Sequence, residues 1–205
     1  MEVMTTTTRA ERTVAALSKA LFDFLAEHNL SELNVSELCR LAGIHRTTFY
    51  GHYQGIEEFA ASVYAQTLDR LLGDAFPAGP ASATVEAFAA ECLEAQVRVQ
   101  QRVLEDRPVY RSLFTAGGNG AFRHAVEENA VRRTRIGFGV LRQFGVREAD
   151  PDGPGVAFVA AGYAAWLEKW ALSDSDDAEG SSRDMLQYLP TWWPRPEAPG
   201  AVPEV

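Results

Sequence analysis

Residues 34–53 read NVSELCRLAGIHRTTFYGHY, and this stretch decides the fold because its pattern is typical of two short helices joined by a tight turn. Asn34 is a favourable N-cap, and Leu33 and Leu38 are placed to form a hydrophobic staple around it. Glu37, three residues after Asn34, is placed to complete a capping box. A helix is therefore expected to begin directly after Asn34.

The same stretch contains the signals that end the first helix and start the second. Gly43 suits the left-handed position after a helix C-terminus, where residues with a Cβ atom are strained. Ile44 can then pack back into the core, and a second helix is expected to begin near His45. Two helices joined by a short turn that contains glycine form the helix-turn-helix geometry, whose second helix enters the major groove of DNA.

Two segments of this stretch, VSELCRLAGI at 35–44 and TFYGHY at 48–53, resemble the N-terminal domain of the TetR family of bacterial transcriptional repressors. The resemblance covers roughly residues 9–64, and beyond it the chain is similar to the family only in length and helical layout. It implies an all-α protein with an N-terminal three-helix helix-turn-helix DNA-binding domain. A C-terminal helical domain for ligand binding and dimerisation would follow.

Three residues depart from the pattern of that family. The family commonly has a small N-capping Ser where this chain has His45, and a Gly or another small residue where it has Thr47. Both positions lie where bases are read, so they bear on the operator sequence rather than on the fold. The family also has a Lys where this chain has Ile56, and its replacement removes a phosphate contact.

The N-terminal end of the second motif helix meets base edges in this geometry, so we expect His45, Arg46 and Thr47 to read bases. The guanidinium of Arg46 can pair bidentately with guanine, which is worth about 1–3 kcal/mol of discrimination. The alternative is that these side chains form the solvated surface of an ordinary helical hairpin. The complete set of predicted DNA-binding residues is Arg9, Ser36, His45, Arg46, Thr47, Thr48, Tyr50 and His52.

The length and composition indicate a globular chain, with 205 residues of which 46% are hydrophobic. There is no run of about 18 uncharged apolar residues, and the first residues, MEVMTTTT, lack the apolar stretch of a signal peptide. We therefore expect a cytoplasmic protein with no membrane association. Cys39 and Cys92 are the two cysteines, and neither lies in a CxxC motif or a Cys/His cluster. This pattern predicts two buried thiols, no metal site and no cofactor.

The net charge of −9 argues at first against nucleic acid, because contacts with phosphate supply most non-specific affinity. Most of the excess lies at the far end, since residues 148–205 hold 3 basic and 11 acidic side chains, a balance of −8. Residues 1–60 still hold 5 basic and 8 acidic side chains, a balance of −3. We expect modest DNA affinity with a shallow salt dependence, so that specificity comes from base readout and from dimer avidity.

Apolar periodicity and the positions of proline and glycine predict the organisation of the chain. The predicted parts are a disordered arm at 1–8, the DNA-binding domain at 9–54, a linking helix at 55–75, a regulatory and dimerisation domain at 76–193 and a disordered tail at 194–205. The expected helices are 10–28, one from Gly55 to about Asp74, 83–106, 109–114, 121–144, 156–172 and 183–189. The segment SDSDDAEGSS at 173–182 is expected to be an exposed acidic loop.

Large aromatic residues and a few polar ones recur on the helices predicted for the second half of the chain. They predict an apolar pocket for a small-molecule effector, although several must belong to an ordinary core. Arginines in the same region either contribute to a site for an anionic effector or form a solvated face paired with acids. Catalysis has little support, because Cys92 and His124 lack the surroundings of a nucleophile or a metal ligand. The predicted pocket residues are Phe88, Cys92, Gln96, Tyr110, Phe114, Phe138, Tyr163 and Trp166.

A homodimer is expected through the helices at 156–172 and 183–189, because Ala157, Ala161, Ala164 and Ala165 would let a partner helix approach closely. Taken together, these features predict a sequence-specific regulator of transcription that binds a palindromic operator in double-stranded DNA. It would be a repressor that a small-molecule effector releases from the operator. The alternative is a helical adaptor or enzyme that retains a non-functional DNA-binding head.

Overall fold

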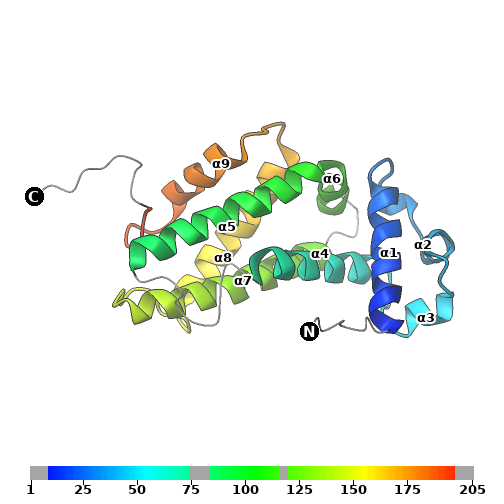
Figure 1. Cartoon of the computed structure of the whole chain (residues 1–205), viewed down its shortest axis with the longest axis horizontal. Helices are drawn as coiled ribbons and strands as arrows, with labels where there is room; N and C mark the ends of the chain where they lie inside the picture. Colours follow the sequence, from blue (N-terminus) through cyan, green and yellow to red (C-terminus); the bar gives the residue numbers. More distant parts are fainter. Residues whose placement is uncertain (1–8, 74–83, 116–119, 197–205) are drawn as a thin grey trace, which may run out of the picture. The chain divides into compact units, whose positions relative to one another are not determined.

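The computed structural model describes residues 9–73, 84–115 and 120–196, and the predicted break at 76–82 lies outside these ranges. So do the predicted arm at 1–8 and most of the predicted tail. All regular elements in the described part are helices, and no strand occurs there, so the predicted all-α class is correct (Figure 1). The α-helices are α1 (Arg9–Leu25), α2 (Val35–Ala42), α3 (Arg46–Tyr50), α4 (Ile56–Gly73), α5 (Val85–Glu105), α6 (Arg107–Thr115), α7 (Gly120–Gln143), α8 (Pro154–Leu172) and α9 (Ala178–Met185), with 3₁₀ helices η1 (Leu30–Glu32) and η2 (Leu186–Tyr188).

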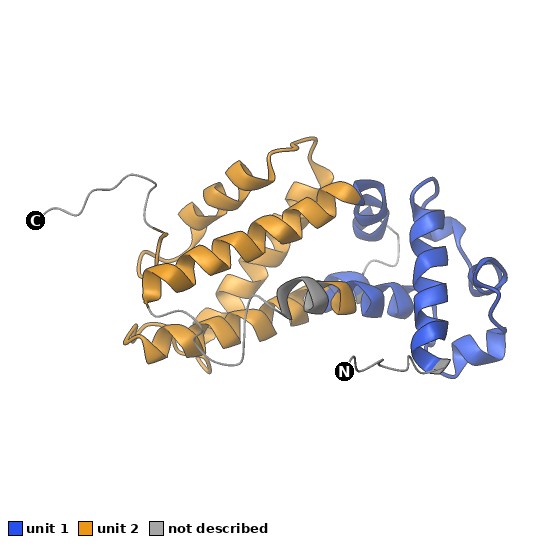
Figure 2. Cartoon of the chain, in the orientation of Figure 1, with its two compact units in different colours: residues 1–64, 106–125 blue, residues 65–105, 126–205 orange. Residues whose placement is uncertain are grey.

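Two compact units make up the chain, and each is formed by two segments that are separated in the sequence (Figure 2). Unit 1 comprises residues 1–64 and 106–125, and unit 2 comprises residues 65–105 and 126–205. Helices α4 and α7 each contribute residues to both units.

The core of unit 1 is built from the apolar stripe of α1 and the helices that follow it. Leu17, Leu21 and Leu25 recur at helical spacing and are each 1% exposed. The helix ends at Leu25, three residues before the predicted end, and the chain then reaches α2 through η1. Leu38 from α2 and Phe59 from α4 are fully buried, so three helices share one core.

Helix α6 belongs to unit 1, together with the helix-turn-helix segment, although it lies far along the sequence within residues 76–193. Its Tyr110 meets Tyr64 of α4 edge to face at 6.1 Å, and Phe122 at the start of α7 lies 4.8 Å from the Tyr64 ring. Phe114 lies 5.0 Å from Phe122, so one aromatic cluster joins the two segments of the unit. Such contacts join residues far apart in the sequence, and local periodicity carries no signal for them.

A buried hydrogen bond also attaches α6 to the connection between α1 and α2. The backbone N–H of Leu30 donates to the Ser112 hydroxyl at 2.7 Å, and both residues are buried. Leu30 is the first residue of η1, so its N–H has no partner within that helix. Ser112 supplies the partner from a position 82 residues further along the chain.

Unit 2 packs its long helices around an apolar cluster that contains Phe88 of α5 and Phe138 and Leu141 of α7. Helix α8 contributes buried Val156 and Val159 to the same cluster. Side chains from beyond η2 cover it, since Trp192 lies 5.3 Å from the Phe138 ring in an edge-to-face arrangement. Phe138 is 0% exposed, so it is an ordinary core residue of this unit.

The prediction of an exposed acidic loop at 173–182 is wrong for its second half, because α9 begins at Ala178. Asp177 acts as N-cap, with its carboxylate accepting from the Gly180 N–H at 2.8 Å. The helix packs against α5, and Ser182 is fully buried with its hydroxyl 2.8 Å from Oε1 of Gln100. Since that hydroxyl donates its one proton to Ala178 O at 2.7 Å, we infer that the Gln100 amide is rotated to donate to it.

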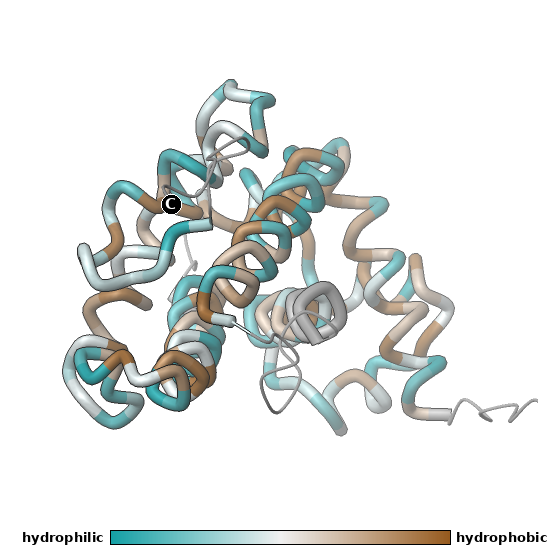
Figure 3. Tube along the Cα trace, turned by 60° about the vertical axis from the view of Figure 1, so that its left-hand side comes forward, coloured by the Kyte–Doolittle hydropathy of each residue, from teal (hydrophilic) through white to brown (hydrophobic). Residues whose placement is uncertain are grey.

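Hydropathy varies around the turns of the long helices, with hydrophobic and hydrophilic positions interleaved along each of them (Figure 3). This interleaving is the pattern of helices that bury one face and leave the other exposed. No helix in the described ranges is both long enough and apolar enough to cross a membrane.

Candidate functional site

Helix α2 begins as the sequence predicts, with one difference in its cap. Asn34 is the N-cap, and its side-chain oxygen accepts from the Glu37 N–H at 3.0 Å. The capping box predicted for Glu37 is not formed, because its carboxylate accepts from Nε and Nη2 of Arg40 at 2.9 and 2.6 Å. Two charge-assisted hydrogen bonds from a guanidinium outcompete a single bond from a neutral backbone N–H. The hydrogen bonds from Arg40 also lower the pKa of Glu37.

The turn between α2 and α3 has the predicted geometry, which sets the angle between the two helices. Gly43 has φ +65°, a left-handed conformation that disfavours any residue with a Cβ atom. Its N–H donates to Arg40 O at 3.3 Å, and the Ile44 N–H donates to Cys39 O at 2.9 Å. These two bonds form a Schellman motif, which satisfies carbonyl groups at the end of α2 and turns the chain into α3.

Phe49 fixes helix α3 on the core of unit 1. It is fully buried, and its ring lies 5.7 Å from that of Tyr53 and 5.8 Å from that of Phe59 on α4. Tyr53 and Phe59 are themselves in edge-to-face contact at 4.9 Å. A five-residue helix has too few internal hydrogen bonds to be stable alone, so this aromatic packing determines its orientation.

The N-cap and first turn of α3 present the predicted row of exposed polar residues: His45, Arg46, Thr47 and Thr48 are all exposed. Tyr50 is 50% exposed, and the guanidinium carbon of Arg46 lies 5.8 Å from its ring centroid. This cation–π contact supports the long Arg46 side chain on the surface. Arg46 makes no ion pair with any residue in the described ranges, so its charge remains available to an anionic partner.

The structure gives fewer contacts for the remaining predicted DNA-binding residues. Ser36 and His52 are exposed. Helix α1 begins at Arg9, but the side chain of that residue lies outside the described part. Ile56, at the position where the TetR family commonly has Lys, is 6% exposed and belongs to the core of unit 1. It therefore stabilises the unit instead of offering a charge to DNA.

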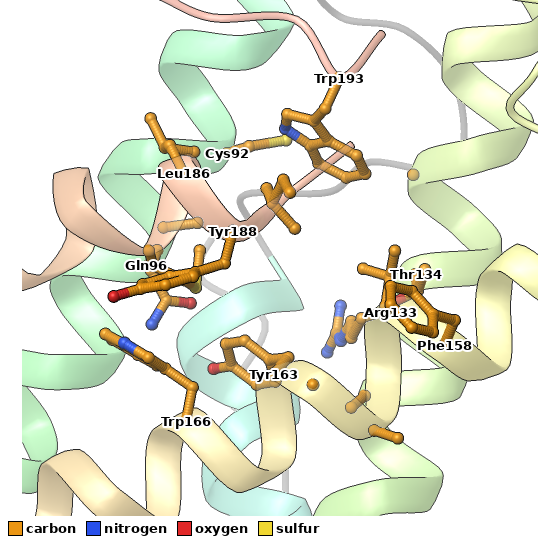
Figure 4. Close-up of a pocket in the computed structure, with 18 of the residues that line it drawn as sticks. Cys92, Gln96, Arg133, Thr134, Phe158, Tyr163, Trp166, Leu186, Tyr188 and Trp193 are labelled. Carbon is orange, nitrogen blue, oxygen red and sulfur yellow. The ribbon is translucent and has the colours of Figure 1, made fainter. Parts of the chain in front are cut away.

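Unit 2 contains a cavity of about 610 Å³ between α5, α7, α8 and the η2 region (Figure 4). This volume is within the range of about 300–1,000 Å³ that is typical of pockets for small molecules. The residues that line it are Cys92, Leu93, Ala95, Gln96, Asn129, Ala130, Arg133, Thr134, Gly137, Phe158, Val159, Ala161, Gly162, Tyr163, Trp166, Met185, Leu186, Tyr188, Leu189 and Trp193.

Half of the residues predicted for a pocket line this cavity. Cys92, Gln96, Tyr163 and Trp166 do so. Phe88 and Phe138 are instead in the core of unit 2, and Tyr110 and Phe114 are in the aromatic cluster of unit 1. The four residues that lie elsewhere have one feature in common: a helix with a broad apolar face can direct an aromatic residue either into a core or into a cavity.

The predicted pocket residues do not include the lining residues of α7 and the η2 region, although Arg133 is one of the arginines for which a site for an anionic effector was an open alternative. Asn129, Arg133 and Thr134 line the cavity from α7, and the spacing of four residues between Asn129 and Arg133 places these two on one face of that helix. Polar residues recurring on the inward face of a helix were the signal that could have identified them. Tyr188 and Phe158 are 77% and 75% exposed, so they belong to the rim of the cavity.

The predicted polar residues of the cavity are uncharged at neutral pH. Burial raises the pKa of the Cys92 thiol to about 12, with a smaller contribution from the nearby charge of Glu91. Burial also raises the pKa of Tyr163 to about 12, and the neighbouring Gln96 side chain acts in the opposite direction. The side-chain Nε2 of Gln96 is buried and has no hydrogen-bond partner among the described residues. Cys92, Gln96 and Tyr163 therefore offer neutral hydrogen-bond donors in largely apolar surroundings.

Helix α8 carries an exposed apolar face next to this cavity. Ala157, Ala161 and Ala165 are exposed as the dimer prediction requires, together with Phe158. Ala164 is 4% exposed, so it packs inside its own chain and does not belong to that face.

A metal centre finds no support in the described ranges, where no group of three or more His, Cys, Asp or Glu side chains is placed to hold an ion.

The fold matches solved structures of transcriptional regulators, whereas no protein-family model and no curated protein matches the sequence. A TetR transcriptional regulator from Rhodococcus sp. RHA1 is 16% identical, with 89% of this chain and 97% of that chain covered and a TM-score of 0.58. A transcriptional regulator from Pseudomonas aeruginosa PAO1 is 19% identical, with coverages of 91% and 93% and a TM-score of 0.62. NalD, the secondary repressor of the MexAB-OprM multidrug efflux pump in Pseudomonas aeruginosa, is 19% identical, with coverages of 91% and 100% and a TM-score of 0.54. The fold of this chain is therefore that of the TetR-family transcriptional regulators.

Proposed function

We propose that the protein is a sequence-specific DNA-binding regulator of transcription that acts in the cytoplasm. The exposed row at the start of α3 is the observation that carries this proposal, because Arg46 lies there on a helix anchored by Phe49 and has no acidic partner among the described residues. In a helix-turn-helix, the N-terminal residues of the second helix meet base edges. The DNA-binding part is residues 9–54, and residues 55–75 link it to the regulatory part at 76–193.

Base readout is assigned to His45, Arg46 and Thr47, and phosphate contacts are assigned to Thr48, Tyr50 and His52. The guanidinium of Arg46 suits bidentate pairing with O6 and N7 of guanine. Tyr50 supports that guanidinium through its ring and has a hydroxyl available for a phosphate oxygen. Readout and positioning are thereby combined on one turn of helix.

A homodimer would supply the second reading helix. Ala157, Phe158, Ala161 and Ala165 form an exposed apolar face on α8, and small side chains let a second helix approach closely. A two-fold dimer would hold two copies of α3 about 34–36 Å apart, the spacing of successive major grooves on a palindromic operator. Two half-sites bound together also compensate for a head with few basic residues.

The cavity of unit 2 would bind a small-molecule effector that releases the protein from its operator, so that the protein acts as a repressor. Its volume, its apolar lining and its few neutral donors support this proposal. Release requires only that the effector prefers the conformation that does not bind DNA, by a coupling free energy of about 1–3 kcal/mol. The description of NalD as a repressor is in line with this assignment.

Footprinting on the DNA that flanks the gene for this protein tests the proposal. The expected result is a protected palindrome with two half-sites one helical turn apart. Arg46→Ala should require a higher protein concentration for protection, whereas Arg132→Ala, which removes one exposed arginine from α7, should leave the protection unchanged. Absence of any protected site at low salt, with the head folded, would favour the alternative of a helical adaptor or enzyme with a non-functional head.

A further inference from the structure

The charge of the effector can be inferred from the residues that line the cavity of unit 2. Among those residues, Arg133 is the only charged one. It is half-buried, and its Nε atom is fully buried. Among the described residues no carboxylate lines the cavity, and Glu91, which influences the neighbouring Cys92, lies outside the lining.

This charge distribution disfavours a cationic ligand. An ammonium group loses its hydration when it is buried, and here it would find no carboxylate in the lining and a like charge on Arg133. The same lining favours a carboxylate ligand, because a guanidinium can donate two parallel hydrogen bonds to the two carboxylate oxygens. The hydroxyl of Thr134, on the same helix and in the same lining, can donate to the same group.

A second polar position lies on the other side of Tyr163. Figure 4 shows Tyr163 between Gln96 on one side and Arg133 on the other. Gln96 is 9% exposed and lines the cavity. Its buried Nε2 meets no acceptor with hydrogen-bond geometry among the described residues, although the Gln96 side chain is close enough to the Tyr163 hydroxyl to lower the pKa of that group. A buried donor that lacks a well-aligned acceptor is unfavourable, and a ligand oxygen placed beside it would supply that acceptor.

The remaining wall is apolar and rich in rings. Tyr163 and Trp166 are stacked with their ring centroids 6.3 Å apart, and Trp193 and Phe158 line the same cavity. Rings of this kind prefer to pack against flat or cyclic hydrocarbon bodies. The volume of about 610 Å³ leaves room for a body of two or more rings.

We propose that the effector is an aromatic monocarboxylic acid whose carboxylate pairs with Arg133 and whose rings lie against Tyr163, Trp166 and Trp193. An oxygen substituent on the ring body would accept from Gln96. This inference rests on the proposed function only in naming the ligand an effector, since the binding chemistry belongs to the cavity itself.

Three probes of matched shape test the charge preference on the full chain: para-phenylbenzoate, para-phenylbenzyl alcohol and para-phenylbenzylamine. Isothermal titration calorimetry gives each Kd. The carboxylate should bind about 10- to 100-fold more tightly than the alcohol, the range that a hydrogen bond to a charged group contributes, and the amine should bind weakest. Equal binding of the carboxylate and the alcohol, tighter binding of the amine, or no binding of any probe would each overturn the inference.

The Arg133→Gln variant tests whether this one side chain causes the preference for the carboxylate over the alcohol. It should weaken the binding of para-phenylbenzoate by about 10- to 100-fold. The Kd of the alcohol should change by less than about twofold, which also shows that the cavity is intact. Arg132→Gln, the same change at the adjacent exposed position of α7, should change neither Kd. If Arg133→Gln fails to fold, Arg133→Lys keeps the charge and loses the bidentate geometry, so the carboxylate should bind with an intermediate Kd. Unchanged carboxylate binding in the folded Arg133 variant would refute the role of this residue.

Operator binding separates this inference from the proposed function. If para-phenylbenzoate binds through Arg133 but leaves operator affinity unchanged, the ligand class stands and the release mechanism fails. If the protein binds its operator but none of the probes, the ligand class fails and the regulator assignment stands.

Discussion

The hydrogen bond from the Leu30 N–H to Ser112 gives a quantitative prediction for Ser112→Ala. Removing the hydroxyl leaves a buried backbone donor without a partner, which costs about 1–3 kcal/mol. Ser112 lies within α6, where alanine is the better helix former by about 0.5 kcal/mol. The expected net loss in the free energy of unfolding is therefore about 0.5–2.5 kcal/mol. For a chain of this length the melting temperature should fall by roughly 1–10 °C.

Urea unfolding of the full chain, followed by circular dichroism, measures this loss, and hydrogen exchange locates it. The amide of Leu30 should lose its protection in Ser112→Ala while the amides of α1 keep theirs. Ser62→Ala is the matched control, because the Ser62 hydroxyl donates only to Phe59 O within its own helix. That variant should change stability by less than about 0.5 kcal/mol. The reasoning fails if the two variants are equally stable and the Leu30 amide stays protected.

Three further changes follow from named contacts. Asp177→Ala removes the cap on Gly180 and should lower the free energy of unfolding by about 0.5–2 kcal/mol in urea titrations, with a result below 0.2 kcal/mol arguing against the cap. Because the pKa values of Cys92 and Tyr163 are raised to about 12 in the fold, the folded chain keeps protons that the unfolded chain releases, so stability should fall as pH rises from about 9 to about 12. Cys92→Ala should flatten that decline by up to about 1.4 kcal/mol per pH unit, and an unchanged pH profile would contradict the assignment. Tyr50→Phe keeps the ring under Arg46 and should weaken the binding of specific and non-specific DNA alike by about 1.5–3 kcal/mol in anisotropy titrations. A loss of affinity for one sequence only would make Tyr50 a base-reading residue.

The helix-turn-helix could be predicted because its determinants lie within a few residues of one another. Asn34 signals the start of α2 and Gly43 its end, and the structure has both where the sequence places them. Each signal acts on its own backbone through a local hydrogen bond or a φ angle, so no knowledge of distant residues was needed.

Features that depend on distant partners were not predictable in the same way. Glu37 has a cap pattern, yet its carboxylate bonds to Arg40, because the sequence does not rank competing donors. The start of α9 at Ala178 was not predicted, because it lies within an acidic segment that was interpreted as a loop, although Asp177 is a common capping residue. The position of α6 in unit 1 depends on Ser112 and on aromatic contacts across the sequence, which periodicity does not encode.

The cavity shows the same limit for a binding site. Cys92, Gln96, Tyr163 and Trp166 were identified because they lie on inward faces of predicted helices. Phe138 has an equally apolar setting in the sequence but is covered by Trp192 and Trp193, which come from beyond η2. Which aromatic residues face a cavity is decided by the elements that pack against them, and those contacts are tertiary.

The affinity of the wild type and of Arg46→Ala, measured by fluorescence anisotropy on the protected operator and on single base-pair variants, tests most directly whether α3 reads DNA. Arg46→Ala should cost about 1–3 kcal/mol per half-site on the operator and nothing further where the contacted guanine is already replaced. An equal loss on every sequence would make Arg46 a phosphate contact, and no loss on any sequence would contradict the assignment of α3 as the reading helix.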